Sequence, residues 1–257
     1  MSGRLEGRFA LVTGSGKGLG VAIAEGLARE GAHVAVHYRS SAAGAEETAE
    51  RIRALGRQAV TVQADISVAD DVARMAQEVI GAFGRLDVLV NNVGDMAAHQ
   101  MSWRDMTAES IDHTLTLDIK GTMLMTHEFG RRMLDDQQSG SIVNIGSRVV
   151  VEGSPRAPQY AAAKYAILGI SKSYAHALAP HVRVNTLGPG FVETQALLDR
   201  DDWKTGRRES VLAHTPLARI PQPEDIVPPV IFLASDDSRH ITGAFLLCDG
   251  GHSMVGA

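Results

Sequence analysis

The sequence predicts an α/β fold: a doubly wound parallel sheet of about seven strands, with helices on both faces. Short, nearly continuous apolar segments alternate with segments of helical periodicity along the chain, which is the pattern of parallel strands covered on both sides. A glycine-rich turn separates the first apolar segment from the first helical one. The 257 residues, 44% hydrophobic and 21% charged, suffice for one large domain over residues 1–257, and no repeat or linker divides them.

Each expected element follows from a local pattern. Strands are expected where apolar residues run together, at residues 9–13, 33–38, 59–63, 86–90, 141–145, 182–185 and 244–247. Helices are expected where apolar residues recur every three or four positions, at residues 21–28, 45–55, 68–83, 106–134, 160–178 and 223–234. The longest stretch without a clear period, residues 191–216, is expected to form a mobile substrate flap.

The turn after the first strand has the composition of a dinucleotide-binding loop. It reads Gly14-Ser15-Gly16-Lys17-Gly18-Leu19-Gly20 and leads directly into a helix. Glycines let the backbone approach a pyrophosphate closely, and the N–H groups at the start of the helix face its negative charge. Many tight turns carry glycines, but a strand, a glycine turn and a helix in this order predict a Rossmann-type site.

Further polar or glycine-containing segments follow other strands. Asn91-Asn92-Val93-Gly94 follows the fourth strand, Ser147 the fifth, and Pro189-Gly190 the sixth. In open parallel sheets, ligands bind outside the carboxyl ends of the strands, near the point where the strand order reverses. These segments are therefore expected to meet the glycine turn at one binding site.

Tyr160 and Lys164 lie four residues apart on an expected helix, and therefore on one face of it. A phenol has an ordinary pKa of about 10, and an ammonium one turn away favours its ionised form, so the hydroxyl exchanges a proton near neutral pH. A lone pair of this kind is more often a buried tyrosine beside a lysine that reaches solvent. Ser147, thirteen residues before Tyr160, and the glycine turn favour the catalytic interpretation.

Together these motifs resemble the short-chain dehydrogenase/reductase family in its single-domain form. Any one of the motifs is weak evidence, but six in the same order are specific. The similarity runs from about Gly7 to Gly251 and comprises Thr13-Gly14-x-x-x-Gly18-x-Gly20, Asp65, Asn91-Asn92-Val93-Gly94 with valine for the family's alanine, the Ser147, Tyr160 and Lys164 set, Asn185-x-x-x-Pro189-Gly190 with Thr194, and Asp249-Gly250-Gly251.

The resemblance implies hydride transfer between a nicotinamide cofactor and a carbonyl carbon. Tyr160 would exchange the proton, Ser147 would hold the substrate oxygen, and Lys164 would lower the tyrosine pKa and bind the nicotinamide ribose. No metal site is expected. The residues expected at the cofactor are Gly14, Ser15, Lys17, Gly18, Leu19, Gly20, Tyr38, Arg39, Ser40, Asp65, Ile66, Asn91, Val93, Gly94, Tyr160, Lys164, Pro189, Gly190, Val192 and Thr194.

The chain departs from the family at Asp118, which stands where the family has an asparagine in the catalytic set. In the family the main-chain carbonyl at this position holds a water that leads to the lysine, and the side-chain amide braces the helix against a strand. The carbonyl remains here, but a carboxylate cannot donate a hydrogen bond unless it is protonated.

Two orientations of Asp118 are open. An ionised carboxylate turned toward the Lys164 water chain would favour the charged lysine. A carboxyl group turned into the brace would face a backbone carbonyl, and burial would raise its pKa. The exchange is either tolerated with some loss of rate, or it marks an altered active site. Asp118→Asn is expected to raise turnover at neutral to alkaline pH and to leave cofactor affinity nearly unchanged.

Cofactor choice is expected to depend on the end of the second strand. An acidic residue there would bind the ribose 2′-OH of NAD, but the chain has Tyr38, Arg39 and Ser40, with Lys17 in the glycine turn. Two cations without a carboxylate favour the 2′-phosphate of NADP(H). NAD is the less favoured alternative, and it applies if both cations are merely solvated.

The substrate is predicted only as a class: a small-molecule or acyl-thioester carbonyl, or the corresponding secondary alcohol. A 3-oxoacyl thioester reductase and a small ketone or sugar dehydrogenase both suit the resemblance. The expected pocket walls, residues 95–101, 148–159 and 191–214, mix apolar and charged side chains. The alternative function is a dinucleotide-binding protein with weak or no turnover, which only Asp118 favours.

The composition also limits the partners. A net charge of −5 without a run of Lys or Arg gives no reason to expect a nucleic acid or an anionic membrane. No apolar stretch approaches the ~20 residues of a membrane-spanning helix, no signal peptide is evident, and a cytoplasmic location is expected. The single cysteine, Cys248, is interpreted as a small buried hydrophobe. A homotetramer is expected, because in the family the helices corresponding to residues 107–134 and 160–178 pair across a two-fold axis.

Overall fold

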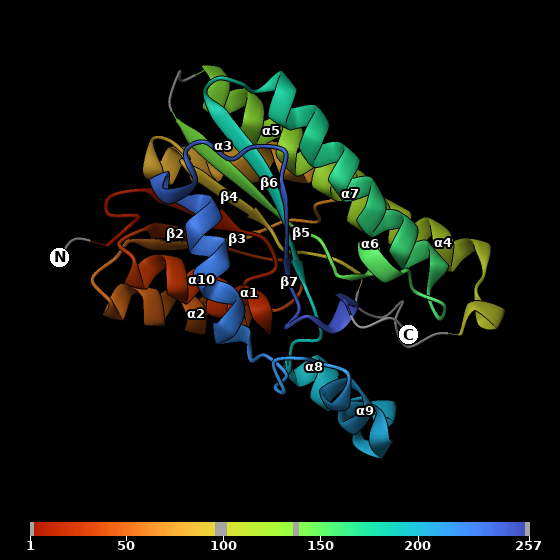
Figure 1. Cartoon of the computed structure of the whole chain (residues 1–257). Helices are drawn as coiled ribbons and strands as arrows, with labels where there is room; N and C mark the ends of the chain where they lie inside the picture. Colours follow the sequence, from red (N-terminus) through yellow and green to blue (C-terminus); the bar gives the residue numbers. More distant parts are fainter. Residues whose placement is uncertain (1–2, 96–101, 136–138, 255–257) are drawn as a thin grey trace.

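The computed structural model describes residues 3–95, 102–135 and 139–254. Its centre is a seven-stranded parallel sheet with the order β3-β2-β1-β4-β5-β6-β7 (Figure 1). The strands are β1 (Phe9–Val12), β2 (His33–Tyr38), β3 (Ala59–Gln63), β4 (Val88–Asn91), β5 (Gly140–Ile145), β6 (Val182–Pro189) and β7 (Phe245–Cys248). The predicted fold class is confirmed.

Helices cover both faces of the sheet (Figure 1). On one face α1 (Leu19–Arg29), α2 (Ala42–Ala54) and α10 (Pro223–Ala234) pack into one apolar cluster. On the other face α3 (Ala69–Phe83), α5 (Thr122–Asp135) and α7 (Pro158–Ala177) pack into a second. The strands are apolar on both sides because both of these layers bury them.

The strand order reverses between β1 and β4. β1 pairs with β2 on one side and with β4 on the other, so the two halves of the sheet run outward from this point. The carboxyl ends of β1 and β4 therefore lie next to each other, at the switch point where sheets of this kind bind ligands. The glycine turn and the Asn91–Gly94 segment both begin there.

Strand β6 is longer than its sequence pattern indicates. It was expected to end at residue 185, but it continues to Pro189, because residues 186–189 pair with β7. That pairing joins segments about 60 residues apart in the chain, with Thr186 opposite Phe245 and Pro189 opposite Cys248. Local apolar periodicity carries no information about such a partner.

The long helix expected at residues 106–134 is divided into several pieces. A short turn, η2 (Trp103–Asp105), precedes α4 (Ala108–Thr114). A π-helical segment, η3 (Leu115–Gly121), then joins α4 to α5 and contains Asp118. A π-helical turn has one more residue than an α-helical turn, and such turns occur often at functional sites.

The segment 191–216, expected to be irregular, holds three short helical pieces: α8 (Gln195–Leu198), η4 (Trp203–Arg207) and α9 (Arg208–Ala213). They lie at one end of the molecule, away from the sheet (Figure 1). They have a small apolar cluster of their own, formed by Leu197, Trp203, Val211 and Ile220. Pieces of four to six residues are too short to show a helical period, which is why the sequence pattern missed them. The mobility of this segment stays a prediction.

Another short helix, α6 (Val149–Glu152), lies between β5 and α7. Within the described ranges no helix is both long enough and apolar enough to span a membrane.

Candidate active site and cofactor site

The glycine turn has a backbone that side chains would obstruct. Gly14 and Gly18 have φ of +66° and +60°, a region that residues with a Cβ seldom adopt. A Cβ on Gly20 would lie 2.3 Å from the Gly14 carbonyl oxygen. The turn leads into α1, whose N-cap residue is Gly18, a residue with no side chain to cap the first N–H groups. These N–H groups are therefore left for an anion.

Two buried side chains hold the glycine turn from within. The Ser15 hydroxyl donates to the Val12 carbonyl at 2.7 Å and accepts from the His37 backbone N–H at 3.1 Å. The imidazole of His37 accepts from the Gly14 N–H through Nδ1 (2.9 Å) and contacts the Ala64 carbonyl through Nε2 (3.0 Å). These partners fit a neutral ring whose proton is on Nε2. Burial lowers the His37 pKa to about 4, so the ring stays neutral near pH 7.

The segment after β4 is fastened to the glycine turn by Thr13. The Thr13 hydroxyl accepts from the N–H groups of Asn92 (2.8 Å) and Val93 (3.1 Å), and the Asn92 side chain donates to the Thr13 carbonyl (2.9 Å). Asn91 points elsewhere: its amide donates to Asn144 on β5 (2.8 Å) and to Thr126 on α5 (3.1 Å). The Asn91 side chain therefore braces the core, and only its backbone borders the site.

The residues expected to select the cofactor gather where β2 and β3 end. Tyr38 is half-buried, whereas Lys17, Arg39 and Ser40 are exposed. Arg39 Nη1 lies 3.7 Å from Asp65 Oδ2, and Asp65 accepts hydrogen bonds from the backbone and hydroxyl of Ser67. The guanidinium is thus at the position expected for a ribose phosphate, with one carboxylate near it. Ile66 is buried beneath this loop.

The start of the 191–216 segment reaches the glycine turn. A Cβ on Gly18 would lie 3.9 Å from the Thr194 methyl group, so the two residues face each other. Gly190 is tightly packed, because a Cβ there would lie 2.9 Å from Asp249. Thr194 therefore lies beside the glycine turn, and the contact of Pro189, Gly190 and Val192 with the cofactor stays a prediction.

Ser147, Tyr160 and Lys164 converge at the carboxyl end of β5. All three are buried. The Ser147 hydroxyl is hydrogen-bonded to Tyr160, and Lys164 Nζ lies 5.3 Å from the centroid of the tyrosine ring. Lys164 also donates to the Ile145 carbonyl at 3.3 Å. Tyr160 and Lys164 on α7 thus lie beside Ser147 on the loop after β5.

The Tyr160 pKa lies above its ordinary value. Burial raises it most, Lys164 lowers it, Asp118 raises it again, and Ser147 and Arg148 lower it. The lysine acts in the direction that the sequence predicted, but burial and Asp118 outweigh it. The Lys164 pKa also lies above its ordinary value. Burial lowers it, but the interactions with Asp118 and Tyr160 raise it by more, so Lys164 is protonated.

Asp118 takes up a position that combines features of both expected orientations. Its Oδ2 lies 3.0 Å from Lys164 Nζ, and both side chains are buried. Its Oδ1 accepts from the backbone N–H of Asp95 at 2.6 Å. At the brace, Asp118 thus meets a backbone N–H donor, and not the backbone carbonyl expected for the second orientation. An ionised carboxylate can accept from this N–H and pair with Lys164 at the same time.

Three residues at the site have structural roles that were not assigned from the sequence, although Asn92 stands in the quoted motif and Asp95 begins an expected pocket wall. Asp95 is buried, provides the N–H that Asp118 accepts, and accepts from the Thr114 hydroxyl on α4 at 2.7 Å. With His37 and Asn92, it positions groups that the motifs contain. The signal available was weak: a lone histidine in an apolar strand and an aspartate directly after a glycine. Of the expected pocket walls, residues 96–101 lie outside the described residues.

The residues present fit a nicotinamide dinucleotide. A Cβ on Gly20 would collide with the Gly14 carbonyl oxygen, and a Cβ on Gly14 would lie 3.0 Å from a Val93 methyl group, so only glycines allow the turn to fold this closely. Gly94 faces the catalytic lysine, because a Cβ there would lie 2.8 Å from Lys164 Nζ and 3.3 Å from Asp118 Oδ2. Glycine backbone therefore borders both the start of α1 and Lys164, as the close approach of an extended dinucleotide requires.

Comparisons with known proteins agree with this geometry. The family model described as "Enoyl-(Acyl carrier protein) reductase" matches residues 14–253. The 3-oxoacyl-(acyl-carrier-protein) reductase FabG of Staphylococcus aureus is 39% identical over 96% of this chain and 98% of that protein. An L-rhamnose 1-dehydrogenase (NAD(P)(+)) of a Sphingomonas strain is 34% identical over 96% of each.

A solved structure agrees as well. A short chain dehydrogenase from Burkholderia cenocepacia in complex with NADP superposes with a TM-score of 0.87 and 34% identity, over 97% of this chain and 99% of that one. The matches span nearly the whole chain and include the glycine turn and the Ser147, Tyr160 and Lys164 set. The chain therefore belongs to the short-chain dehydrogenase/reductase family, whose oxidoreductases act on CH–OH and C=O groups.

Proposed function

We propose that this protein is an NADP(H)-dependent oxidoreductase that transfers hydride between the nicotinamide and a carbonyl or secondary alcohol. The observation that carries the proposal is the convergence of Ser147, Tyr160 and protonated Lys164 at the carboxyl end of β5. When bound, the nicotinamide supplies or accepts the hydride.

The residues of this chain then have separate tasks. Tyr160 exchanges a proton with the substrate oxygen, since general acid–base catalysis requires a proton within hydrogen-bond reach. The Ser147 hydroxyl, already bonded to Tyr160, holds the same oxygen as charge develops on it. Lys164 binds Asp118 and Ile145 in the structure, and its third N–H is available for the ribose.

NADP(H) is the proposed cofactor because of charge. Arg39 and Lys17 are exposed beside the glycine turn, and a guanidinium binds phosphate oxygens in a fixed fork. The nearby Asp65 carboxylate, 3.7 Å from Arg39, is half-buried and already accepts from Ser67. The bound NADP in the Burkholderia structure supports the same choice. NAD remains the less favoured alternative.

The proposed substrates are a 3-oxoacyl thioester, as for the FabG relative, or a small ketone or sugar, as for the rhamnose dehydrogenase. Arg148, next to Ser147, stacks on Phe191 with 4.1 Å from Cζ to the ring centroid and pairs with Glu152. Because Glu152 already pairs with the Arg148 charge, this wall of the site favours neither an acidic nor a neutral substrate.

A panel of carbonyl compounds with NADPH tests the function. It should include a 3-oxoacyl thioester and simple ketones, and, with NADP+, aldoses and secondary alcohols. Oxidation of NADPH with at least one carbonyl compound is expected. The alternative, a dinucleotide-binding protein with little turnover, predicts cofactor binding without oxidation for every member of the panel.

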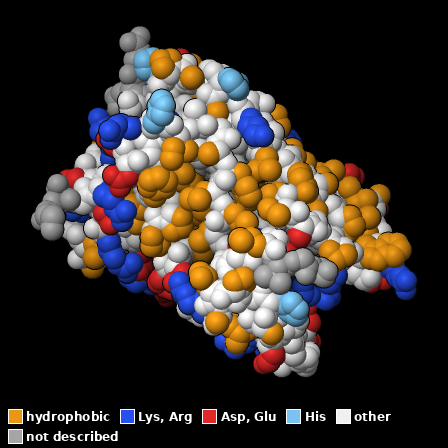
Figure 2. Space-filling view, viewed as in Figure 1, with side chains coloured by type: hydrophobic (Ala, Val, Ile, Leu, Met, Phe, Trp, Pro, Cys, Tyr) orange, Lys and Arg blue, Asp and Glu red, His pale blue; other side chains and the backbone are white. Residues whose placement is uncertain are grey.

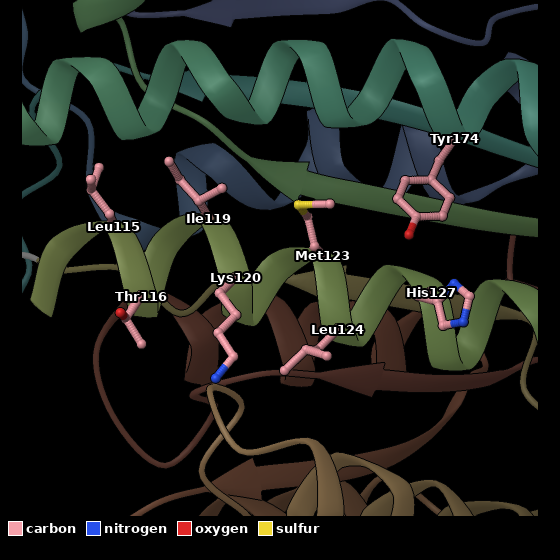
Figure 3. Close-up of a pocket in the computed structure, with 8 residues that line it drawn as sticks. All are labelled: Leu115, Thr116, Ile119, Lys120, Met123, Leu124, His127 and Tyr174. Atoms are coloured by element: carbon pink, nitrogen blue, oxygen red, sulfur yellow. The ribbon is translucent and has the colours of Figure 1, made fainter. Parts of the chain in front are cut away.

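We further propose a homotetramer. An apolar groove on η3, α5 and α7 is lined by Leu115, Thr116, Ile119, Lys120, Met123, Leu124, His127 and Tyr174. In Figure 3, Leu115, Ile119 and Met123 point toward α7, and the Tyr174 side chain extends from α7 toward His127. Met123 and Tyr165 are 44% and 50% exposed, more than apolar side chains of this size usually are on a monomer.

A second apolar area supports four copies and not two. Figure 2 shows apolar side chains gathered over α7 and also around β7 and α10. β7 is the last strand of the sheet, and all four of its residues, Cys248 included, are only half-buried. An apolar edge strand of this kind is normally covered. The cytoplasmic location stays a prediction.

A further inference from the structure

Asp118 and Lys164 form an ion pair that is removed from water. Lys164 Nζ and Asp118 Oδ2 are 3.0 Å apart, with 4% and 0% of the two side chains exposed. The second carboxylate oxygen is fixed by the Asp95 N–H at 2.6 Å. An asparagine could keep this second contact through its amide oxygen, but it would bring no charge to the lysine. The difference between the two residues is therefore one buried negative charge.

That charge acts on the tyrosine through the lysine. With Asp118 ionised and Lys164 protonated, the buried pair has no net charge. Ionising Tyr160 would leave a net negative charge in a place from which water is excluded, and this is costly. With an asparagine at this position, the same ionisation would only neutralise the lysine.

Charged groups reach Tyr160 from three elements. Lys164 lies on the same helix, α7; Asp118 comes from η3; and Arg148 follows β5. Asp95, after β4, raises the Lys164 pKa less than Asp118 and Tyr160 do. Asp118 is the anion among these that contacts the lysine directly.

We propose that Asp118 is a positioning residue that keeps Tyr160 protonated through neutral and moderately alkaline pH, and thereby suits the site to carbonyl reduction more than to alcohol oxidation. This rests on the proposed function. In the reduction, the carbonyl carbon forms a C–H bond with the hydride of the reduced nicotinamide, which becomes oxidised. The π electrons of the C=O bond move to oxygen, the Tyr160 O–H bond breaks to protonate that oxygen, and solvent reprotonates the phenolate.

The equilibrium constant of the reaction is unaffected by this arrangement. The pH range of each direction is what changes: reduction needs the phenol, and oxidation needs the phenolate. A higher Tyr160 pKa extends reduction to higher pH and delays the onset of oxidation. A dehydrogenase that oxidises alcohols at neutral pH would gain from the opposite arrangement.

The test is Asp118→Asn, compared with the wild type and with Asp95→Asn as a matched control. kcat/KM is measured against pH in both directions, with the best carbonyl compound of the panel and NADPH, and with its alcohol and NADP+. For Asp118→Asn, both the alkaline limb of reduction and the acid limb of oxidation should move to lower pH, by roughly one unit or more. Reduction at alkaline pH should therefore fall, the opposite of the gain expected from the sequence, because Asp118 contacts Lys164 directly. Asp95→Asn keeps the ion pair and should shift these limbs much less.

A titration that needs no turnover accompanies the kinetics. The ultraviolet absorbance of tyrosinate is followed with pH, with the Tyr160→Phe protein as the blank for the other tyrosines. Tyr160 should ionise at lower pH in Asp118→Asn than in the wild type. Unchanged limbs and an unchanged titration would overturn the proposal. So would a shift to higher pH, which would mean that Lys164 gives up its proton without Asp118.

The two proposals fail differently. If the wild type oxidises NADPH but Asp118→Asn shows no displacement, the function stands and the role of Asp118 is wrong. If no carbonyl compound is reduced but the titration is displaced, the role of Asp118 in setting the tyrosine pKa is supported and the proposed function is not.

Discussion

In the proposed function, Arg39 is the side chain on which cofactor choice depends most directly. Its guanidinium is 58% exposed and lies 3.7 Å from Asp65, so a ribose phosphate would compete with one distant carboxylate. Arg39→Asp should weaken NADPH binding by about 2 kcal/mol or more, since it removes a charge-assisted hydrogen bond and adds repulsion. NADH binding should change less or improve. Equilibrium titration of both cofactors measures this.

Arg239→Asp is the control for this change, because Arg239 is also exposed but follows the η5 turn (Asp236–Ser238) near the far end of the sheet. It should leave both affinities nearly unchanged. A wild type that binds NADH as tightly as NADPH would refute the assignment of Arg39 to the phosphate.

His37 makes the stability of the glycine turn depend on pH. Burial lowers its pKa from 6.5 to about 4 in the folded chain, and the unfolded chain has the ordinary value. The folded state therefore binds this proton less readily, so the stabilisation is complete above pH 6.5 and is lost as the pH falls toward 4. The loss over this window should amount to a few kcal/mol, on the order of 1.4 kcal/mol per pKa unit.

The measurement is the urea unfolding free energy between pH 4 and 7 for the wild type and for His37→Asn. Asparagine keeps an acceptor for the Gly14 N–H but does not titrate in this range, so the variant should lose less stability on acidification. Parallel curves for the two proteins would show that His37 is not the group responsible.

At this scale the sequence predicted the residues whose spacing is local. Tyr160 and Lys164 are one helical turn apart, and the glycine turn is continuous in the chain. His37 and Asp95 were missed because their partners lie 23 residues away, at Gly14 and at Asp118. The departure at Asp118 was visible, but its orientation depended on an N–H that no local pattern reveals.

The segment 191–216 is held by a core of its own, and Trp203 is the largest side chain in it. Trp203 is 2% exposed and packs with Leu197, Val211 and Ile220, with its ring 5.5 Å from that of Phe191. Trp203→Ala should cost about 3–5 kcal/mol of local stability, as for other buried aromatic residues. Because the main core does not include this cluster, the Trp203→Ala protein should have a clearly raised KM and only a slightly lower Tm.

Leu198→Ala is the matched control, since Leu198 is the neighbour of Leu197 on α8 but is 37% exposed. In the Leu198→Ala protein, the KM and the sensitivity of residues 191–216 to protease should stay near the wild-type values. Trp203→Ala, which loosens this segment, should raise both. Equal effects of the two variants would show that the small cluster does not hold the segment together.

Elements were predicted well where both their faces are apolar and poorly where a neighbour shapes them. Strands β1, β2, β4 and β5 were predicted because their residues are mostly apolar and nearly all buried, and the half-buried β7 was predicted because its residues form a continuous apolar run. The π-helical turn at Leu115–Gly121 was not, although it includes Gly121, where a Cβ would lie 2.8 Å from Ile66. A backbone of this shape is determined by packing against the loop after β3, which the local sequence does not describe.

The proposed homotetramer is a property of the whole molecule and rests on its exposed apolar side chains. Met123, 44% exposed, lies in the groove between α5 and α7. Met123→Asp places a charge where the proposed partner copy would bury it, which is costly without a counter-charge, so sedimentation should show smaller species. Leu55→Asp, at a 42% exposed site after α2, should sediment as the wild type does. A wild type that is monomeric at micromolar concentration would refute the proposal.

The most direct test of the account is the rate of NADPH oxidation by the wild type and by Tyr160→Phe across the carbonyl panel. Phenylalanine keeps the buried ring beside Lys164 but has no proton to give. The wild type should turn over at least one carbonyl compound, and Tyr160→Phe should be slower by roughly 10²- to 10⁴-fold, the usual worth of a general acid, while still binding NADPH. A Tyr160→Phe protein as fast as the wild type, or a wild type that binds NADPH and reduces nothing, would contradict the account.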